Sequence, residues 1–434
     1  MAHNHNEIAE AIMEQHTLIT FEDTKEIFVY NEEKGIYEPG EILIDQLVQN
    51  ELKEDTKTHF VNEVKESIRR QTYRPRDVVG KDLHEIPLEN CIYNFETHTT
   101  IPFTPEKVFL NKHPITWQDE PLLGENPIDK FLHEVMETQE DALLLKEIAG
   151  YCFYRKMPFQ NFFMLVGKGS NGKSVFIKVL QTLLGEQNYS TLSLQTISEG
   201  GFELSFLYGK NANIVGDLPK KAFQDVGHIK ELTGGDTITA KQKFKDPIKF
   251  HSYAKLISAC NEVPETPDMT DGFFRRAMLI NFPYCFEGRE NRNLAEEIMT
   301  PQNMCDFFKS CISAFKMALE NNNFIRIETL DMRKDKYMIY SNSAIAFCHA
   351  CLDYDPEEMM PSEDIYKKYM VYCKEKRTVA KDEIRFFKSL YTHFGNKVWK
   401  KRILEDFNDK QVRRYVIQGI FWKEVKSGIP VKSD

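Results

Sequence analysis

The sequence Gly167-Lys168-Gly169-Ser170-Asn171-Gly172-Lys173-Ser174 matches the pattern GxxxxGK[ST] at every defined position. A buried-looking apolar run, 162–166, precedes it, and an amphipathic pattern over 173–184 follows it. Strand, glycine-rich loop and helix in this order surround an anion with backbone amides and a helix N-terminus. The stretch therefore predicts a nucleotide site in an α/β domain, with Lys173 at the β- and γ-phosphates and Ser174 on Mg²⁺.

Three further polar groups border strand-like apolar runs, which are 212–215, 256–260 and 277–282. Asp217 follows the first run, where an acid can hold the metal ion through water. Asn261 closes the second run, where its amide can hydrogen-bond the attacking water or the γ-phosphate. The pair Arg275-Arg276 precedes the third run and can neutralise charge that develops in phosphoryl transfer, on its own site or a neighbour's. Each alone also fits an ordinary role as a loop aspartate, a strand-ending asparagine or a surface ion pair.

A lysine-rich segment lies between Asp217 and Asn261. In an extended strand Lys241, Lys243 and Lys245 share one face, with Phe244 on the other face and a turn expected at 246–247. Three lysines on one edge of a hairpin suit a sugar-phosphate chain. A plain solvated hairpin is an equally good interpretation of this segment taken alone.

The charge of the chain is unevenly distributed. The net charge is −10, but residues 361–434 contain 18 Lys or Arg against 10 Asp or Glu. A basic end on an acidic body indicates that any nucleic-acid contact is local, because phosphate binding needs clustered positive charge. The nine cysteines have no repeated spacing and are expected to be reduced thiols. No apolar run is long enough to cross a bilayer, so we expect a soluble, cytoplasmic protein without membrane partners.

The hydrophobic pattern predicts three domains: 1–120, 121–325 and 335–434. The first is expected to be mixed α/β, with a helix over 7–16 and strands at 26–30 and 35–37. The second is expected to be an α/β nucleotide-binding domain preceded by two helices within 128–154 and followed by a helix over 303–319. The third shows helical patterns over 344–354, 362–374 and 381–394, then strand-like runs at 398–404 and 414–425. Three helices followed by two strands predict a winged-helix module.

The ordered motifs resemble one known family. GKGSNGKS, NIVGD, IKELTGGDTITAK, LISACNEVP and DGFFRRAMLINFP are similar to the motifs of superfamily 3 helicases, specifically the helicase region of phage and plasmid primase-helicases and their poxvirus-type relatives. The resemblance implies an AAA+-like P-loop NTPase core and hexameric rings. It also implies ATP-driven 3′ to 5′ translocation on single-stranded or forked DNA, in the replication of a mobile element, plasmid or virus. A separate primase or polymerase is an expected partner.

The resemblance assigns roles to individual residues. Lys173 and Ser174 bind ATP and Mg²⁺, and Asp217 is the Walker B acid. Asn261 is the sensor. Arg276, or alternatively Arg275, is the finger that completes a neighbour's site. Lys241 and Lys243 are candidates for DNA contact.

The sequence departs from the family pattern in two ways. Gly216 stands where a second acid is often seen, which leaves the general base unassigned, and we expect no fused primase domain before the helicase region. Slow hydrolysis would suit an alternative function, that of an ATP-switched replication initiator or assembly factor that binds DNA without processive unwinding.

Overall fold

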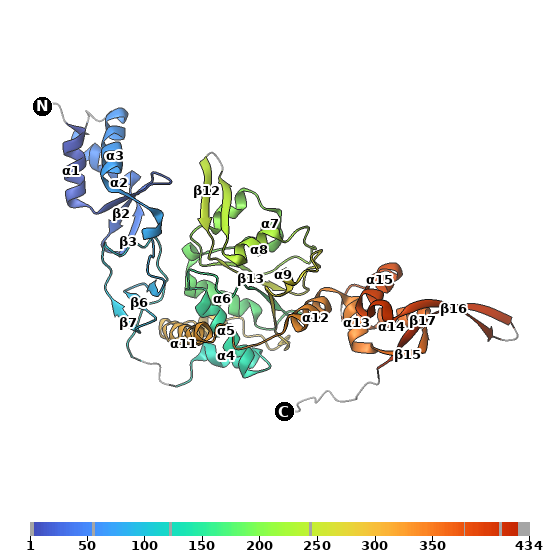
Figure 1. Cartoon of the computed structure of the whole chain (residues 1–434). Helices are drawn as coiled ribbons and strands as arrows, with labels where there is room; N and C mark the ends of the chain where they lie inside the picture. Colours follow the sequence, from blue (N-terminus) through green and yellow to red (C-terminus); the bar gives the residue numbers. More distant parts are fainter. Residues whose placement is uncertain are drawn as a thin grey trace.

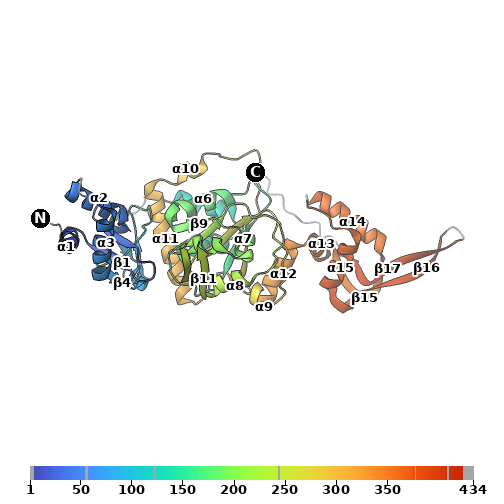
Figure 2. The ribbon, with the colours of Figure 1, turned by 90° about the horizontal axis from the view of Figure 1, so that it is seen from above.

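The computed structural model describes residues 4–53, 57–120, 124–242, 245–376, 378–407 and 410–423. Three parts follow one another in a row: an N-terminal part, a central part built on the largest sheet, and a C-terminal part that ends in a long two-stranded ribbon (Figure 1). The same order is seen from above (Figure 2). The lysine-rich hairpin stands on the central part, and the ribbon projects away from it.

The N-terminal part is mixed α/β, as the sequence predicts. Its three helices are α1 (His5–Gln15), α2 (Glu41–Leu52) and α3 (Thr58–Thr72). They pack on a four-stranded sheet of order β3-β2-β1-β4, made of β1 (Leu18–Phe21), β2 (Ile27–Asn31), β3 (Ile36–Pro39) and β4 (Tyr73–Arg74). A 3-10 turn, η2 (Arg76–Val78), leads to a small sheet of β5 (Glu85–Pro87), β6 (Ile92–Asn94) and β7 (Thr99–Ile101).

The central sheet has five parallel strands in the order β14-β8-β13-β10-β9. They are β8 (Phe162–Val166), β9 (Tyr189–Ser190), β10 (Ala212–Val215), β13 (Lys255–Cys260) and β14 (Ala277–Asn281). The four apolar runs predicted as strands are confirmed, because each is buried on both faces as parallel strands require. Strand β9 was not predicted, since two residues are too short to give a pattern.

Helices cover both faces of this sheet. Side chains of β8 alternate between two cores, because Phe163 and Leu165 join one apolar cluster while Phe162 and Met164 join the other. The first face carries α4 (Pro127–Val135), α5 (Gln139–Tyr151), α6 (Lys173–Leu184) and α11 (Pro301–Glu320). The second carries α7 (Leu194–Glu199), η4 (Phe202–Leu207), α8 (Gly227–Gly234) and α9 (Asp271–Phe274). The remaining short elements are η3 (Glu186–Asn188) and α10 (Leu294–Ile298).

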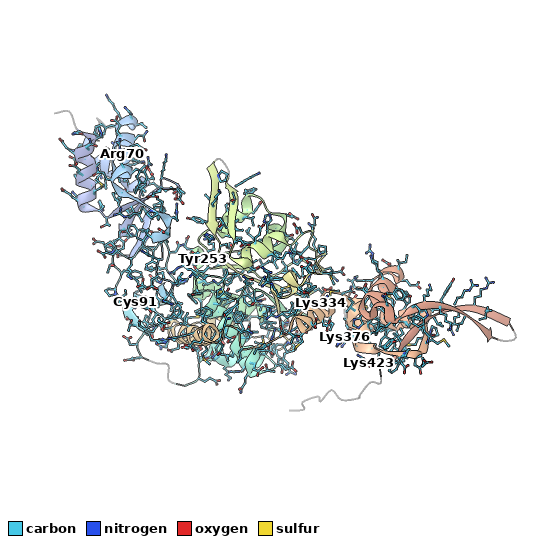
Figure 3. The ribbon with its side chains drawn as sticks, in the orientation of Figure 1. Arg70, Cys91, Tyr253, Lys334, Lys376 and Lys423 are labelled. Carbon is cyan, nitrogen blue, oxygen red and sulfur yellow. The ribbon has the colours of Figure 1, made fainter. Side chains whose placement is uncertain are left out.

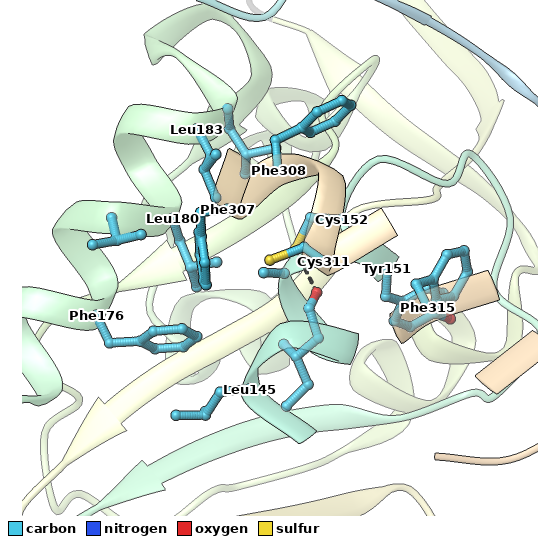
Figure 4. Packing of buried hydrophobic residues seen from close by; sticks show 14 of the residues in the cluster. Leu145, Tyr151, Cys152, Phe176, Leu180, Leu183, Phe307, Phe308, Cys311 and Phe315 are labelled. Carbon is cyan, nitrogen blue, oxygen red and sulfur yellow. Dashed lines mark hydrogen bonds between the residues drawn. The ribbon is translucent and has the colours of Figure 1, made fainter. Parts of the chain in front are cut away.

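Helices α5 and α11 approach closely at Gly150, beside the packed side chains of Cys152, Cys311 and Phe315 (Figure 4). A Cβ at Gly150 would overlap the carbonyl oxygen of Cys311 in α11. Gly150→Ala should therefore lower the free energy of unfolding by about 1–3 kcal/mol or more, since a packed core resists added volume. Urea unfolding measures the change. Gly227→Ala is the control, because a Cβ there would lie at ordinary van der Waals distance from its neighbours, and an equal loss in both variants would contradict the expectation.

The C-terminal part differs from its prediction in one strand. Helix α12 (Leu330–Ser341) still packs on the central part, because Tyr337 lies in the apolar cluster of its second face. The helices of the C-terminal part are α13 (Ser343–Cys351), α14 (Ser362–Glu375) and α15 (Glu383–Phe394), with η5 (Gly395–Lys397) after them. Its sheet has the order β15-β17-β16, with β15 (Leu352–Pro361), β16 (Trp399–Phe407) and β17 (Lys410–Trp422). The helix predicted over 344–354 was wrong at its end, because Leu352 starts β15, and the prediction of only two strands was wrong for the same reason.

All nine cysteines are free, which agrees with the expectation of reduced thiols. Across the described ranges, no helix combines the length and the apolar character needed to span a membrane.

Candidate nucleotide site

The loop between β8 and α6 has a backbone that only glycine adopts easily. Gly169 has φ +105° and Gly172, the residue before α6, has φ +90°. A Cβ at Gly172 would come within 2.7 Å of Val135 in α4, and one at Gly167 would overlap the side chain of Asn171. The glycines therefore allow the loop to curl tightly at the N-terminus of α6 and against α4, which is the geometry that presents backbone amides to an anion.

Lys173 holds its amine inside this loop. Its Nζ donates hydrogen bonds to the carbonyl oxygen of Gly167 at 2.5 Å and to Oδ1 of Asn171 at 3.0 Å. Burial lowers the pKa of Lys173, while Cys260 and Asp217 oppose that shift. A buried ammonium whose hydrogen-bond acceptors are neutral is incompletely compensated, so the arrangement favours an incoming anion.

A cavity of about 490 Å³ opens at the carboxyl ends of the strands. In open α/β sheets this edge is where ligands bind. Part of its lining comes from the loop and the strand ends: Gly169, Ser170, Asn171, Gly172, Lys173, Ser174, Val175, Gly216, Asp217, Cys260 and Asn261. The structure thus brings Lys173, Ser174, Asp217 and Asn261 to one cavity, with the last three residues exposed.

The other part of the lining was missed by the sequence analysis. It comes from α4 and from the segment after β14: Phe131, Glu134, Val135, Phe286, Arg289, Glu290, Asn291 and Leu294. The segment is tied to the loop, because the amide of Phe286 donates to the carbonyl oxygen of Ser170 at 2.7 Å and Ser170 Oγ donates to Glu290 Oε1 at 3.1 Å. No motif marks these residues, but β14 lies beside β8, so the chain leaving β14 must pass the loop.

The cavity has an apolar side and a polar side. Phe131, Val135, Phe286 and Leu294 form the apolar wall, while Lys173, Ser174 and Asp217 supply charge and hydroxyl oxygen. Ligand pockets for small organic molecules combine an apolar lining with a few polar groups in this way. The arrangement is suited to a ligand with a flat apolar ring at one end and an anion at the other.

The arginine pair lies at the opposite edge of the sheet. The carbonyl of Arg276 accepts a hydrogen bond from the amide of Phe162, the first residue of β8. Five-residue strands separate this edge from the cavity, a distance of about 17 Å at 3.3 Å per residue. Neither Arg275 nor Arg276 lines the cavity, so the structure does not bring them together with Lys173 in one chain.

The two arginine side chains differ in solvent exposure. Arg275 is exposed, and its Nη1 donates to Oε1 of Gln160 at 2.7 Å. Arg276 is half-buried, its Nη1 donates to the carbonyl of Gly272 at 2.6 Å, and burial lowers its pKa, as does the charge of Arg275. Arg275 is therefore the arginine better placed to reach another molecule.

The lysine hairpin was predicted with the wrong turn. Strands β11 (Thr237–Gln242) and β12 (Lys245–His251) pair antiparallel, and Gln242 lies opposite Lys245. Residues 246–247 therefore lie within β12. Lys241 and Lys245 belong to different strands, so the three lysines do not share one strand face. Lys241 is exposed. Lys243 and Phe244 lie outside the described residues, as does the side chain of Lys245.

Two family models match this chain. A family of unknown function, DUF5906, matches residues 165–276, and a family described as D5 N terminal like matches residues 8–137. The first match begins in β8 and ends at Arg276, so it contains the whole loop together with Asp217, Asn261 and both arginines. The second match includes α4, which supplies part of the cavity wall.

Two viral proteins named as helicases are similar to this chain. L207/L206 of Acanthamoeba polyphaga mimivirus is 30% identical over 162 residues, and 121R of Invertebrate iridescent virus 3 is 32% identical over 134 residues. The matched segments cover 36% and 29% of this chain but only 17% and 14% of the viral proteins. This chain therefore spans under a fifth of the length of the viral proteins it matches. A solved structure of the NrS-1 C-terminal region is similar over 96% of this chain and 100% of its own chain, at 11% identity and a TM-score of 0.48.

Proposed function

We propose that this chain is an ATP-dependent DNA helicase of superfamily 3 that acts in the replication of a virus, plasmid or other mobile element. The observation that carries the proposal is the cavity at the carboxyl ends of β8, β10 and β13, where Lys173, Ser174, Asp217 and Asn261 meet. The strand order β14-β8-β13-β10-β9 supports an AAA+-like P-loop core. The helix and strand order from α13 to β17 supports a winged-helix module. The three parts of the molecule support a division into the domains 1–120, 121–325 and 335–434, with the start of the last domain moved to the end of α12, which packs in the central core.

The residues of the cavity fit ATP with Mg²⁺. The buried amine of Lys173 offers the positive charge for the β- and γ-phosphates, and the amides of the glycine loop offer hydrogen bonds to them. Ser174 and Asp217 both line the cavity and supply the oxygen atoms that Mg²⁺ prefers. The apolar wall around Phe131 and Phe286 suits the adenine ring. When bound, Mg²⁺ would neutralise charge on the phosphate oxygens.

The chain's own side chains would orient the attack. Asn261, at the end of β13, would hydrogen-bond the attacking water or the γ-phosphate. Asp217 would hold the metal through water. It could also serve as the base, because it is the one acid among the described strand-end residues that line the cavity, where Gly216 has no side chain. The second wall adds Glu134 and Glu290 as further carboxylates at the cavity.

The position of the arginine pair favours a ring. Since Arg275 and Arg276 lie at the far edge of the sheet, an arginine could reach a nucleotide only in an adjacent subunit packed head to tail. A hexamer is the ring that the family resemblance implies. Because the side chain of Arg275 is exposed and that of Arg276 is half-buried, Arg275 is the better candidate to enter the neighbour's cavity. The hairpin β11–β12, with exposed Lys241, would contact single-stranded DNA.

The test is ATP hydrolysis with and without single-stranded DNA, together with strand separation on forked duplexes that carry a 3′ or a 5′ tail. We expect single-stranded DNA to stimulate ATP hydrolysis. We also expect the duplex that carries the 3′ tail to be unwound. The absence of both stimulation and unwinding would defeat the proposal. The mass of the assembly with ATP and single-stranded DNA gives the ring size.

One observation at the end of β10 favours a second function, that of an ATP-switched initiator. Gly216 lacks a carboxylate, and the space that a Cβ would occupy there is open, so the strand end has no second acid beside Asp217. Slow hydrolysis would suit an ATP-switched initiator that assembles on DNA without moving. Ring formation that depends on ATP, with turnover too slow for any unwinding, would favour this alternative.

A further inference from the structure

Helix α12 packs against α9, the short helix that directly precedes the arginine pair. The ring of Tyr337 in α12 meets the rings of Phe273 and Phe274 in α9 edge to face, with centroids 5.2 and 5.7 Å apart. The Nζ of Lys334 lies 5.8 Å from the centroid of Phe274. Lys334 marks the place of α12 between the central and C-terminal parts (Figures 1 and 3). Since Arg275 directly follows Phe274, this packing places α12 beside the backbone of the arginine pair.

One side chain of α12 bonds the backbone of Arg275. The Nη1 of Arg333 donates a hydrogen bond to the carbonyl oxygen of Arg275 at 2.5 Å, and the Nδ2 of buried Asn161 donates to the same oxygen at 3.1 Å. The side chain of Arg333 is only 10% exposed, so water competes little for its bond. A charged donor also makes a stronger hydrogen bond than a neutral one. Arg333 therefore fixes the backbone from which the Arg275 side chain extends.

A buried carboxylate holds the guanidinium of Arg333 in place. The Oε2 of Glu328, whose side chain is 7% exposed, lies 3.9 Å from the Nε of Arg333. The other carboxylate oxygen lies 3.1 Å from the Nζ of Lys336 and 3.3 Å from the Nε of Arg326. Arg326 in turn donates a hydrogen bond to the carbonyl oxygen of Leu279 in β14 at 2.5 Å. The position of Arg333 is thus set by an ion cluster that is bonded to the central sheet.

The side chain of Arg275 is held less firmly than its backbone. Its guanidinium is exposed, and its Nη1 donates to the Oε1 of Gln160 at 2.7 Å. A cavity of about 300 Å³ opens beside it, and the lining includes Arg333, Asn161 and Glu328. The guanidinium therefore has room to leave Gln160 while its backbone stays bonded to Arg333. A group that stabilises charge in a transition state acts best when its position is fixed in advance.

We propose that Arg333 is a positioning residue for the arginine finger. It fixes the backbone at Arg275, so that the guanidinium is presented to the nucleotide of the adjacent subunit. The inference rests on the proposed function and deepens it, because it gives α12 a part in hydrolysis at the neighbour's cavity. Arg333 does not line the nucleotide cavity of its own chain, so its loss should act through Arg275.

The experiment is a double-mutant cycle on the full chain, with phosphate release measured over hours at saturating ATP, Mg²⁺ and single-stranded DNA. Arg333→Met keeps the apolar stem of the side chain and leaves Glu328 paired with two other cations. We expect turnover to fall about 10- to 100-fold, with unchanged affinity for a fluorescent nucleotide, because a displacement of about 1 Å costs up to this factor. Arg275→Ala, Arg333→Met should be no slower than Arg275→Ala alone, since no finger is left to position.

Lys336→Ala is the matched control. Lys336 lies on the same helix and pairs with the same acid, but within the described residues its Nζ bonds Glu328 and not Arg275. Its turnover should stay close to that of the unmodified protein. Equal losses in Lys336→Ala and Arg333→Met would overturn the proposal, as would weaker nucleotide binding in Arg333→Met. A double variant slower than Arg275→Ala by the full factor of Arg333→Met would also overturn it, because Arg333 would then act elsewhere.

A second measurement separates positioning from damage to the fold. Mixing Arg333→Met with Lys173→Ala in exchanging rings should raise turnover above that of either variant, since Lys173→Ala subunits present a well-placed finger to intact cavities. The absence of any rise would count against the positioning role. If Arg275→Ala itself left turnover unchanged, the finger assignment would fail and this inference with it. If only Arg333→Met left turnover unchanged, the proposed function would stand and the positioning role alone would fail.

Discussion

Replacing Lys173 with alanine should reduce ATP turnover by at least about 10³-fold, which corresponds to about 4 kcal/mol of lost transition-state stabilisation. The amine is the only buried cation among the cavity-lining residues that the structure describes, and it is fixed by Gly167 and Asn171 at the base of the loop. Arg289, the other cation among the described lining residues, is exposed and lies on the segment after β14. Phosphate release under saturating ATP measures the effect.

The control for this variant is Lys178→Ala. Lys178 is exposed on the same helix, α6, and does not line the cavity, so its loss should leave turnover close to that of the unmodified protein. Turnover that survives in Lys173→Ala would mean that the loop does not hold the hydrolysed phosphate. Because any nucleotide hydrolase of this type needs the amine, the result tests the site and leaves the choice between helicase and initiator open.

One physical reason explains why the sequence was enough to place Asp217 and Asn261 at the cavity. Asp217 and Asn261 follow fully buried runs, and parallel strands bring their carboxyl ends to one edge, so local patterns are enough to assemble them. The wall formed by Phe286 and Leu294 has no local pattern. Its place depends on β14 lying next to β8, which is a long-range pairing.

The two errors of secondary structure, the turn predicted at 246–247 and the missed strand β15, also have a common cause. Asp246-Pro247 carries the usual signal of a turn, yet both residues lie in β12, because Pro247 sits in a two-stranded ribbon where a missing amide donor is tolerated. The acidic, proline-containing stretch of β15 is likewise a poor strand former, and its pairing with β17 overrides that preference. In both cases tertiary pairing decided against local propensity.

Replacing Arg275 with alanine should lower turnover by about 10³-fold or more while nucleotide affinity changes little, because an arginine finger acts on charge that develops in the transition state. Arg276→Ala should have the smaller effect on turnover, since its guanidinium is half-buried and bonded to Gly272 within its own chain. Turnover is measured by phosphate release, and affinity by titration of a fluorescent nucleotide.

Mixing two inactive variants tests whether the finger acts between subunits. In Arg275→Ala the cavity is intact but the neighbour receives no arginine, whereas in Lys173→Ala the cavity fails but Arg275 is still presented. If the arginine crosses a head-to-tail interface, equal mixing should restore about a quarter of the normal turnover, because half of the cavities keep their lysine and half of those meet an intact arginine. No recovery in exchanging rings would mean that Arg275 serves its own chain, which the separation of about 17 Å between its edge of the sheet and the cavity argues against.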